Sequence, residues 1–215
     1  MSTLAALAAL LALAGAPPQE EVAHGAGGGA DGRVDYRESR ALGAPSGGSL
    51  VRGVKLPPDG RRYFTWDPVE RRSPSAPWRR WGTDGLVRRT LRVVREYSRA
   101  HPQAPRVGIG DLSLPEGGYF GPEVGGGIGH ATHQNGLDID VYYPLRSDRE
   151  RAPLSVDEIR MRLAQDLVDR FVAAGAETVY VGPNTPLTGP PGVVIPLANH
   201  DNHLHARFPA PPGGP

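Results

Sequence analysis

The sequence predicts an α+β fold, in which a small antiparallel central sheet is flanked by helices and long loops. Strand-like and helix-like segments are mixed along the chain, without the regular β-α-β alternation of an α/β protein. Glycine (29) and proline (23) are both abundant, so much of the chain is expected to be loop. The 215 residues, 39% of them hydrophobic, are enough to bury one core. We therefore expect a single folded domain.

The N-terminal residues have the pattern of a secretion signal. An apolar run covers residues 4–14 and ends in Ala14-Gly15-Ala16, a small-residue pattern typical of signal-peptide cleavage sites. The run is shorter than the roughly 20 residues that cross a bilayer. No Lys or Arg precedes it, so an Ala-rich tail or a misassigned start codon is the alternative. We predict a signal peptide at 1–16 and export to the periplasm or the exterior, without a transmembrane span.

The composition along the rest of the chain predicts the domain boundaries. Residues 17–48 contain the stretches GAGGGADG and APSGG, which carry too little apolar surface to offset the entropy of ordering them. We predict a disordered linker at 17–48, a folded domain at 49–209 and a short tail at 210–215. The absence of any internal repeat agrees with one domain.

Two amphipathic helices are expected within the domain. The first is capped by Thr83 or Asp84 and runs to about Ala100. The second opens with a capping box formed by Ser155 and Glu158. Their apolar stripes recur at helical spacing and comprise Leu86, Thr90, Val94 and Tyr97 in the first, and Ile159, Leu163, Leu167 and Phe171 in the second.

Charge and residue usage exclude several classes of function. The net charge is +1, so there is no basic field of the kind that binds nucleic acid. The chain has no Cys, which excludes disulfides, thiolate metal sites and Cys nucleophiles. Lys55 is the only lysine, and position 52 is Arg52, so the Ser-x-x-Lys motif of serine acyl-enzymes is absent.

Histidines and aspartates gather in two short segments. Five of the seven histidines fall in these segments, namely His130, His133, His200, His203 and His205. One histidine is most simply explained as a hydrogen-bonded, partly buried imidazole. Two clusters, each beside an expected strand, are poorly explained in that way.

Strand alternation brings the two segments together. In LDIDVYY, Asp138 and Asp140 lie on one face of a strand, where aspartate is disfavoured without a specific role. In HLHARF, His203 and His205 share a face in the same way. If these strands pair, a carboxylate faces an imidazole, and His133 on the preceding loop supplies a third group.

Two neutral imidazoles and one carboxylate, with a fourth position open, are the ligand set of a catalytic zinc site. Zinc lowers the pKa of its bound water towards neutrality and generates a hydroxide nucleophile. The sequence therefore predicts Zn²⁺ as cofactor. A mononuclear iron oxygenase is an alternative, but its His-x-Asp pair is absent from the chain, as is the His-Glu-x-x-His helix of common metalloproteases.

The two segments resemble a known family. HATHQNGLDID at 130–140 and HDNHLH at 200–205 are similar to the motifs of the penicillin-insensitive murein endopeptidases, as is the GDLS stretch that precedes them. That family belongs to a wider group of zinc peptidases, which includes lysostaphin-type enzymes, D-alanyl-D-alanine carboxypeptidases and the hedgehog signalling domain. The resemblance covers roughly residues 50–208, and the two motifs are specific only in combination.

The resemblance implies a role for each residue that matches the motifs. His133, Asp140 and His205 correspond to the zinc ligands. His203 corresponds to the general base or transition-state partner. The mechanism implied is hydrolysis of an amide by a zinc-activated water, with His203 moving the proton to the leaving amine.

Further residues of the motifs are expected around these ligands. His130 and His200 are expected to line the catalytic pocket. Gln134 and Asn135 are candidates for binding substrate amides, although a loop-capping role is an equally good explanation. Asp138 is a candidate for orienting a ligand imidazole, with a salt bridge to a nearby Arg as the alternative.

The function implied by the resemblance is a zinc-dependent D,D-endopeptidase that cuts the peptide cross-links of peptidoglycan. The substrate, the peptide stems of peptidoglycan, follows from the resemblance alone. A metal-dependent D,D- or L,D-carboxypeptidase of the cell wall would use the same site. A non-catalytic, zinc-stabilised binding domain is a third possibility, against which the presence of His203 beside the ligands argues.

Overall fold

The computed structural model describes residues 32–125 and 129–210. The predicted signal peptide at 1–16, the first half of the predicted linker and nearly all of the predicted tail lie outside these residues. Within them, helices and strands are mixed, and most pairs in the central sheet are antiparallel. The predicted α+β fold class is therefore confirmed.

The central sheet of the described chain has seven strands, more than a small sheet would have, and two of its strand pairs are parallel. In spatial order the strands are β10 (Val194–Pro196), β9 (Thr178–Val181), β11 (His203–Arg207), β8 (Asp138–Tyr142), β7 (Val107–Ile109), β5 (Tyr63–Thr65) and β4 (Asp59–Gly60).

Smaller elements surround this sheet. Within residues 32–125 and 129–210, two short antiparallel pairs and three α-helices complete the fold, together with 3₁₀-helical turns at Pro77–Arg79 and Val156–Glu158. The pairs are β1 (Arg40–Leu42) with β2 (Ser49–Val51) and β3 (Val54–Lys55) with β6 (Trp81–Gly82). The helices are α1 (Asp84–Ala100), α2 (Pro122–Gly125) and α3 (Met161–Ala173).

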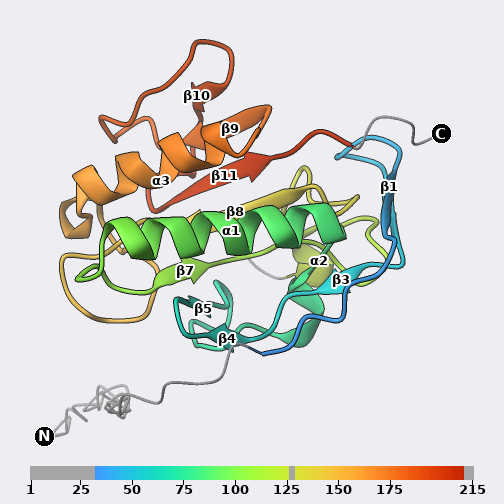
Figure 1. Ribbon diagram of the computed structural model, residues 1–215. Coiled ribbons are helices and arrows are strands. Elements are labelled where there is room, and N and C mark those ends of the chain that lie inside the picture. Colours follow the sequence, from blue (N-terminus) through green and yellow to red (C-terminus); the bar gives the residue numbers. More distant parts are fainter. Residues whose placement is uncertain (1–31, 126–128, 211–215) are drawn as a thin grey trace, which may run out of the picture.

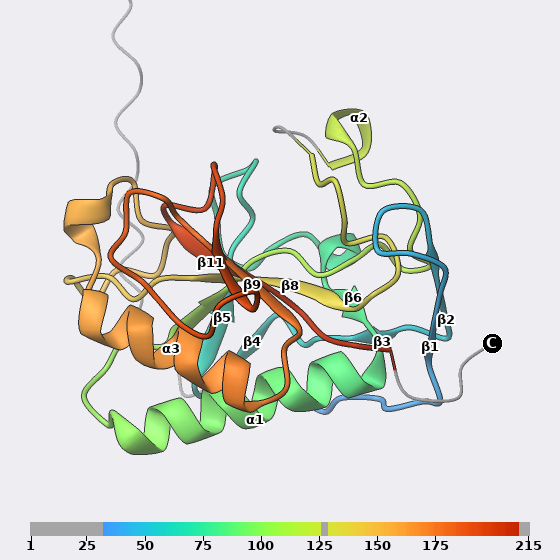
Figure 2. The same cartoon turned by 90° about the horizontal axis from the view of Figure 1, so that it is seen from above.

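The two long helices lie on one face of the sheet. Figure 1 shows α1 and α3 side by side in front of the strands, and Figure 2 shows α2 and several loops on the opposite side. Alternation along β8 sends Ile139 and Val141 into the core under the helices, where both are fully buried. The same alternation leaves Asp138 and Asp140 on the other face, which the loops cover.

The pairing of β8 with β11 is the one that the sequence predicts. The strands are antiparallel, and their register sets His205 opposite Asp140 and His203 opposite Tyr142. A one-residue slip would turn every apolar side chain of the strand out of the core, so the register is strongly specified. The strand pair thus fixes an imidazole beside a carboxylate.

Helix α1 begins and ends close to the predicted residues. Thr83 is its N-cap, and the side-chain Oγ1 of Thr83 accepts a hydrogen bond from the backbone N–H of Leu86 at 3.2 Å. The predicted apolar stripe of this helix is buried. Its capping and its buried face therefore both follow from the sequence.

The capping box predicted for the second helix is wrong. Ser155 makes no capping hydrogen bond, and α3 begins at Met161, after a 3₁₀ turn. The carboxylate of Glu158 instead binds the guanidinium of Arg151 through both oxygens, at 2.7 and 2.9 Å. A bidentate charged pair is stronger than a single cap bond, which explains why Glu158 does not reach back to Ser155.

The ordered domain starts earlier than the predicted boundary at residue 49. Strand β1 lies inside the segment 17–48 and pairs with β2, with Leu42 opposite Ser49. The Gly- and Pro-rich stretch between them forms the turn of this hairpin, in which the Gly47 N–H bonds the carbonyl of Ala44. Glycine and proline mark tight turns as well as linkers, so composition does not separate the two. The linker prediction is thus corrected for residues 40–42.

A charged contact joins the end of α1 to α3. The Asp166 carboxylate of α3 lies 3.0 Å from His101 Nε2, just beyond α1, and 2.5 Å from Arg170 Nε. Burial raises the pKa of Asp166, but the hydrogen bonds from Arg170 and His101 outweigh it, and the pKa falls below its ordinary value of 3.8. The ionised carboxylate therefore stabilises the packing of the two helices.

We expect Asp166→Asn to lower the free energy of unfolding near neutral pH by about 1 kcal/mol, as for other partly exposed ion pairs. Because the pKa is depressed on folding, this stabilisation is complete above the ordinary value of 3.8 and is lost as the pH falls below it. Urea unfolding of wild type and variant near pH 7 and near pH 2.5 measures both effects. The control is Asp169→Asn, an exposed position on the same helix. A difference of equal size at both pH values would contradict this account.

Candidate metal centre

The loop before β8 is shaped by left-handed backbone at three positions. Gly129, His133 and Gly136 have φ angles of 70°, 69° and 75°. The positive φ of Gly136 favours glycine, and a Cβ there would also lie 3.2 Å from the backbone nitrogen of Thr83. His133 adopts a conformation that is strained for a side chain with a Cβ, and it is fully buried. The turn thereby places the His133 ring beside β8.

His133, Asp140 and His205 bring three potential ligand atoms together. His133 Nε2 lies 3.0 Å from His205 Nδ1 and 3.3 Å from Asp140 Oδ1, and His205 Nδ1 lies 3.1 Å from the same oxygen. All three side chains are buried, with at most 5% of each residue exposed. The three residues predicted as ligands therefore converge on one point.

The far nitrogen of each ligand candidate is held by an acceptor. His133 Nδ1 bonds the backbone carbonyl of Leu112, and His205 Nε2 lies 2.8 Å from Asp138 Oδ1. Metal-binding histidines are held in the same way, because the outer hydrogen bond fixes the tautomer that turns the other nitrogen to the metal. Asp138 also accepts from Arg207 Nε at 2.8 Å. Both roles considered for Asp138, orienting an imidazole and pairing with an Arg, are thus present.

The pKa values of His205 and Asp138 are shifted in opposite directions. Burial alone would lower the pKa of His205, but hydrogen bonds to Asp138 and Asp140 outweigh it and raise the pKa to about 9. Burial alone would raise the pKa of Asp138, but the hydrogen bond from His205 and the nearby cationic groups lower it to about 2. Asp138 is therefore ionised across the physiological range and acts only as an acceptor.

His203 faces the same carboxylate from the strand β11. Its Nε2 lies 3.7 Å from Asp140 Oδ1, and its Nδ1 lies 2.7 Å from Asn202 Oδ1. Burial lowers the pKa of His203 to about 4, against the opposing effect of Asp140. The ring is therefore neutral near pH 7. Because Asn202 accepts from Nδ1–H, the lone pair is on Nε2, the nitrogen that faces the site.

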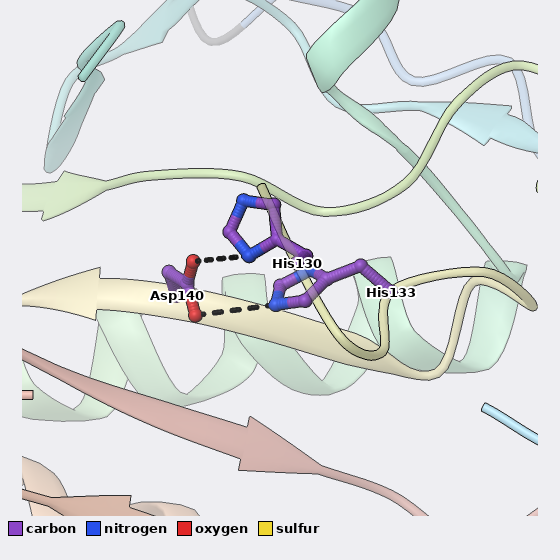
Figure 3. Close-up of side chains that lie close together, drawn as sticks. All are labelled: His130, His133 and Asp140. Carbon is purple, nitrogen blue, oxygen red and sulfur yellow. Dashed lines mark ion pairs between the residues drawn. The ribbon is translucent and has the colours of Figure 1, made fainter. Parts of the chain in front are cut away.

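His130 approaches Asp140 from the other side. His130 Nδ1 lies 3.8 Å from Asp140 Oδ2, and Figure 3 shows His130 and His133 directed at the two oxygens of that carboxylate. Ligand atoms of His130, His133 and Asp140 all lie within 4.8 Å of one another, close enough to hold a metal ion. Both this group and the ligand set implied by the family motifs contain His133 and Asp140. The third member is His130 in this group and His205 in the implied set.

His200 lies beside His203 and Tyr180. Its ring centroid is 4.9 Å from that of His203 and 5.7 Å from that of Tyr180, and its Nδ1 lies 2.8 Å from the carbonyl of Ala198. Burial lowers the pKa of His200. The structure therefore brings His200 beside His203.

Gln134 and Asn135 are both buried, with 7% and 1% exposed. The Asn135 side-chain amide donates to the carbonyl of Gly43 at 3.1 Å, in the turn between β1 and β2. The backbone of Gln134 is also held there, by Pro45 and Gly118. For Asn135 these contacts favour the loop-holding role over direct contact with a substrate.

Several residues of the site were not singled out from the sequence. Leu112 offers only its backbone, and Asn202 is one of four Asn residues, all of which lie in loops, so neither carries a specific signal. Tyr180 could have been found, because a strand paired with β11 must set one residue beside His205, and that residue is Tyr180. Asp111 lies in the GDLS stretch, whose role the sequence does not reveal.

The donor set fits zinc. Two imidazole nitrogens and one carboxylate oxygen form one of the established ligand sets of a catalytic zinc ion. A tetrahedral set with bonds of about 2.1 Å has its donors about 3.4 Å apart, close to the 3.0–3.3 Å that separates these three atoms. The hydrogen bonds on the outer nitrogens complete the arrangement.

In the part of the chain that the structure describes, no helix combines the length and apolarity needed to cross a bilayer.

Comparison with known proteins places this site in a family. The chain is similar to proteins named penicillin-insensitive murein endopeptidase from Klebsiella pneumoniae (31% identical over 151 residues), Yersinia enterocolitica (27% over 146 residues) and Escherichia coli (31% over 111 residues). These matches cover 69%, 68% and 52% of this chain, and 46%, 44% and 35% of those proteins. The chain therefore spans about half the length or less of the curated relatives it matches.

A family model described as penicillin-insensitive murein endopeptidase matches residues 41–180, well over half of the chain. The matched range includes β8 and its preceding loop, which carry His130, His133 and Asp140. The motif at 200–205 lies beyond the matched range. The predicted family is thus confirmed, and the chain belongs to the penicillin-insensitive murein endopeptidase family.

Proposed function

We propose that this protein is an exported, zinc-dependent D,D-endopeptidase that hydrolyses the peptide cross-links of peptidoglycan. The observation that carries the proposal is the convergence of His133 Nε2, Asp140 Oδ1 and His205 Nδ1 within 3.0–3.3 Å of one another. Membership of the family supports the substrate class, because the relatives are named murein endopeptidases. Export follows from the apolar run at 4–14 and from the location of that substrate.

His133, Asp140 and His205 would hold the zinc ion. When bound, zinc supplies Lewis acidity, which polarises the scissile carbonyl and makes a water molecule a nucleophile at neutral pH. The Leu112 carbonyl and the Asp138 carboxylate hold the outer nitrogens of the two imidazoles, so that the inner nitrogens, once deprotonated, would present a lone pair to the metal. The chain thus contributes ligands that are already oriented.

His203 is proposed as the general base. Its neutral ring presents Nε2 to the site, while Asn202 holds the hydrogen on Nδ1. In this state the ring can accept the proton of the attacking water and then pass it to the nitrogen of the leaving amine. The same two roles would apply to either an endopeptidase or a carboxypeptidase.

The substrate would reach these groups along a groove beside β11. A hollow of about 260 Å³ is lined by residues 153–156, Asn199, Asp201 and Asn202. Asn202 also binds His203, so the hollow adjoins the proposed base. We propose that one peptide stem lies there, next to His200. Gln134 remains a candidate substrate contact, whereas the Asn135 amide is engaged by the carbonyl of Gly43.

Digestion of purified cross-linked muropeptides, followed by mass analysis of the products, tests the proposal. We expect dimers to be converted into monomers with no free D-alanine released from monomeric pentapeptide. Release of terminal D-alanine without loss of dimers would identify a carboxypeptidase instead. Binding of muropeptide without any cleavage by the zinc-loaded protein would support the non-catalytic domain.

We expect hydrolysis to be unaffected by β-lactams and abolished by a strong chelator. Penicillins trap a serine acyl-enzyme of the Ser-x-x-Lys type, and that motif is absent because the only lysine, Lys55, has Arg52 three residues before it. The digest is run without addition, with excess penicillin, and with chelator followed by added zinc. Loss of cleavage with penicillin, or undiminished cleavage after removal of metal by chelator and dialysis, would overturn the zinc hydrolase proposal.

A further inference from the structure

Three buried charged side chains form a row behind His130, and the mechanism above does not use them. They are Asp67, Arg79 and Asp111. Arg79 Nη1 lies 2.7 Å from Asp111 Oδ2, and Arg79 Nε lies 3.3 Å from Asp67 Oδ2. Arg79 is 2% exposed, and Asp67 and Asp111 are each 1% exposed. Burying charges in this way gives little net stability even when they are paired, because each group loses its hydration. The arrangement therefore suggests a role other than stability.

Asp67, at the end of the row away from His130, is held by backbone hydrogen bonds. Asp67 accepts hydrogen bonds from the backbone N–H groups of Val69, Glu70 and Ala76, at 3.0, 3.0 and 3.2 Å. The guanidinium of Arg79 also lies over the Trp78 ring, 4.5 Å from its centroid. Arg79 thus has little freedom to move, and the position of the Asp111 carboxylate is fixed through it.

Asp111, at the other end of the row, contacts His130. Asp111 Oδ2 lies 2.8 Å from His130 Nε2. A carboxylate paired with an Arg can only accept hydrogen bonds, so His130 Nε2 carries the hydrogen and donates it. In a neutral ring this leaves the lone pair on Nδ1, the nitrogen that faces Asp140 Oδ2 in Figure 3.

The two carboxylates on either side of His130 are fixed relative to one another by the backbone. The Asp140 N–H donates to the Asp111 carbonyl, and the Gly110 N–H donates to the Asp140 carbonyl, both at 2.9 Å. A Cβ on Gly110 would lie 3.1 Å from Asp140 Cβ, so the glycine permits this close approach. His130 is also held by Phe120, whose carbonyl accepts from its N–H and whose ring centroid lies 4.8 Å from the imidazole.

The same arrangement recurs at the other imidazoles of the site. His133 and His205 each have one ring nitrogen bonded to an acceptor and the other turned towards Asp140. His130 has this arrangement as well, with Asp111 as its acceptor. The recurrence indicates that the outer acceptor sets which nitrogen of each ring faces the reaction centre.

We propose that Asp111, held in place by Arg79 and Asp67, is a positioning residue. It fixes His130 as the tautomer that bears hydrogen on Nε2, so that His130 Nδ1 accepts a hydrogen bond from the attacking water beside Asp140. This inference rests on the proposed hydrolase function, but the tautomer itself is a property of the chain and is measurable without turnover.

The test is Asp111→Leu in the full chain. Arg79 Nη1 and His130 Nε2 both contact Oδ2 of Asp111, so Leu removes the acceptor of His130 while keeping a side chain of similar shape. The preference of the His130 ring for hydrogen on Nε2 is then expected to disappear, so that part of the rings carry it on Nδ1 and turn a donor towards the site. This loss is expected to lower kcat about 10- to 100-fold, with KM and bound zinc close to wild type. Asp111→Asn, whose amide oxygen can take the place of Oδ2 and accept from both donors, is expected to keep the wild-type tautomer and most of kcat.

Two readouts separate positioning from simple structural damage. The first is ¹⁵N NMR of protein labelled on the histidine rings, in which His130 is assigned from the His130→Ala variant. The expected form is Nε2–H in wild type and in Asp111→Asn, and a mixture with Nδ1–H in Asp111→Leu. The second is a double-mutant comparison, in which Asp111→Leu is expected to cost nothing further in kcat when His130 is already Ala.

The matched control is Glu150→Gln. Glu150 binds the guanidinium of Arg106 at 2.6 and 2.7 Å, at a position that contacts none of the site histidines. This variant loses a comparable Arg–carboxylate pair, and it is expected to change neither the His130 tautomer nor kcat. The control therefore measures how much kcat changes when an Arg–carboxylate pair is lost away from the site.

The outcomes distinguish this inference from the proposed function. Nδ1–H on His130 in wild type, or Nε2–H retained as the single form in Asp111→Leu, overturns the positioning role whatever the activity. An equal loss of kcat from Asp111→Leu with and without His130 also overturns it. If wild type cleaves no muropeptide, the proposed function fails, while the NMR result still decides the tautomer. The wild-type spectrum alone keeps the inference testable if the variant does not fold.

Discussion

Replacing Asp140 with Ala is expected to remove both the bound zinc and the hydrolysis of cross-linked muropeptides. The Asp140 carboxylate lies within 3.3 Å of His133 Nε2 and His205 Nδ1, and interactions with those imidazoles lower its pKa well below the usual value despite its burial. It is therefore ionised and supplies the only negative charge among the three proposed ligands. Loss of a ligand should cost more than the 10- to 100-fold that loss of an outer contact costs in metal affinity.

Metal analysis after dialysis, combined with the muropeptide digest, measures this expectation. The control is Asp157→Ala, an exposed aspartate on the 3₁₀ turn before α3, which should keep both zinc and activity. Full zinc occupancy in Asp140→Ala would show that the proposed ligand set is wrong.

His203→Ala is expected to keep the zinc and lose turnover. The ring lies 3.7 Å from Asp140 Oδ1 and is held by Asn202, so it faces the site from outside the triangle of proposed ligands. Loss of a general base typically costs about 10²- to 10⁴-fold in rate. The loss should appear in kcat, while the zinc content stays at that of wild type.

The contrast between these two variants separates ligand from base. Zinc content and kcat are measured on the same preparations, with His101→Ala as the control for loss of a histidine remote from the site. His101 lies beyond α1 and contacts Asp166 of α3. If His203→Ala loses its zinc, His203 is a ligand and the roles of His203 and His205 must be exchanged.

The central strand pair could be predicted from the sequence because strand periodicity is strict. Side chains alternate between faces, so two aspartates in LDIDVYY and two histidines in HLHARF must each share a face. The structure pairs these strands and sets His205 opposite Asp140. The position of the site thus follows from the alternation of side chains along each strand and from the pairing of β8 with β11.

Other parts could not be predicted because they depend on contacts between distant segments. The capping box does not form because Glu158 binds Arg151, a partner that no local pattern identifies. The pairing of Asp67, Arg79 and Asp111 joins three separate segments, and charged residues in loops give no sign that they will be buried together. The β1–β2 hairpin was missed for another reason, since turns and linkers share a composition rich in glycine and proline.

The most direct test of the account is a crystal structure of the zinc-loaded protein, with the metal located by its anomalous scattering. The account predicts one zinc ion bound by His133 Nε2, Asp140 Oδ1 and His205 Nδ1 at about 2.0–2.2 Å, with a water molecule in the fourth position. In that structure His203 and His130 should lie beside the ion and remain unbound to it. A zinc ion held by His130, His133 and Asp140, with His205 outside the coordination sphere, would contradict the account.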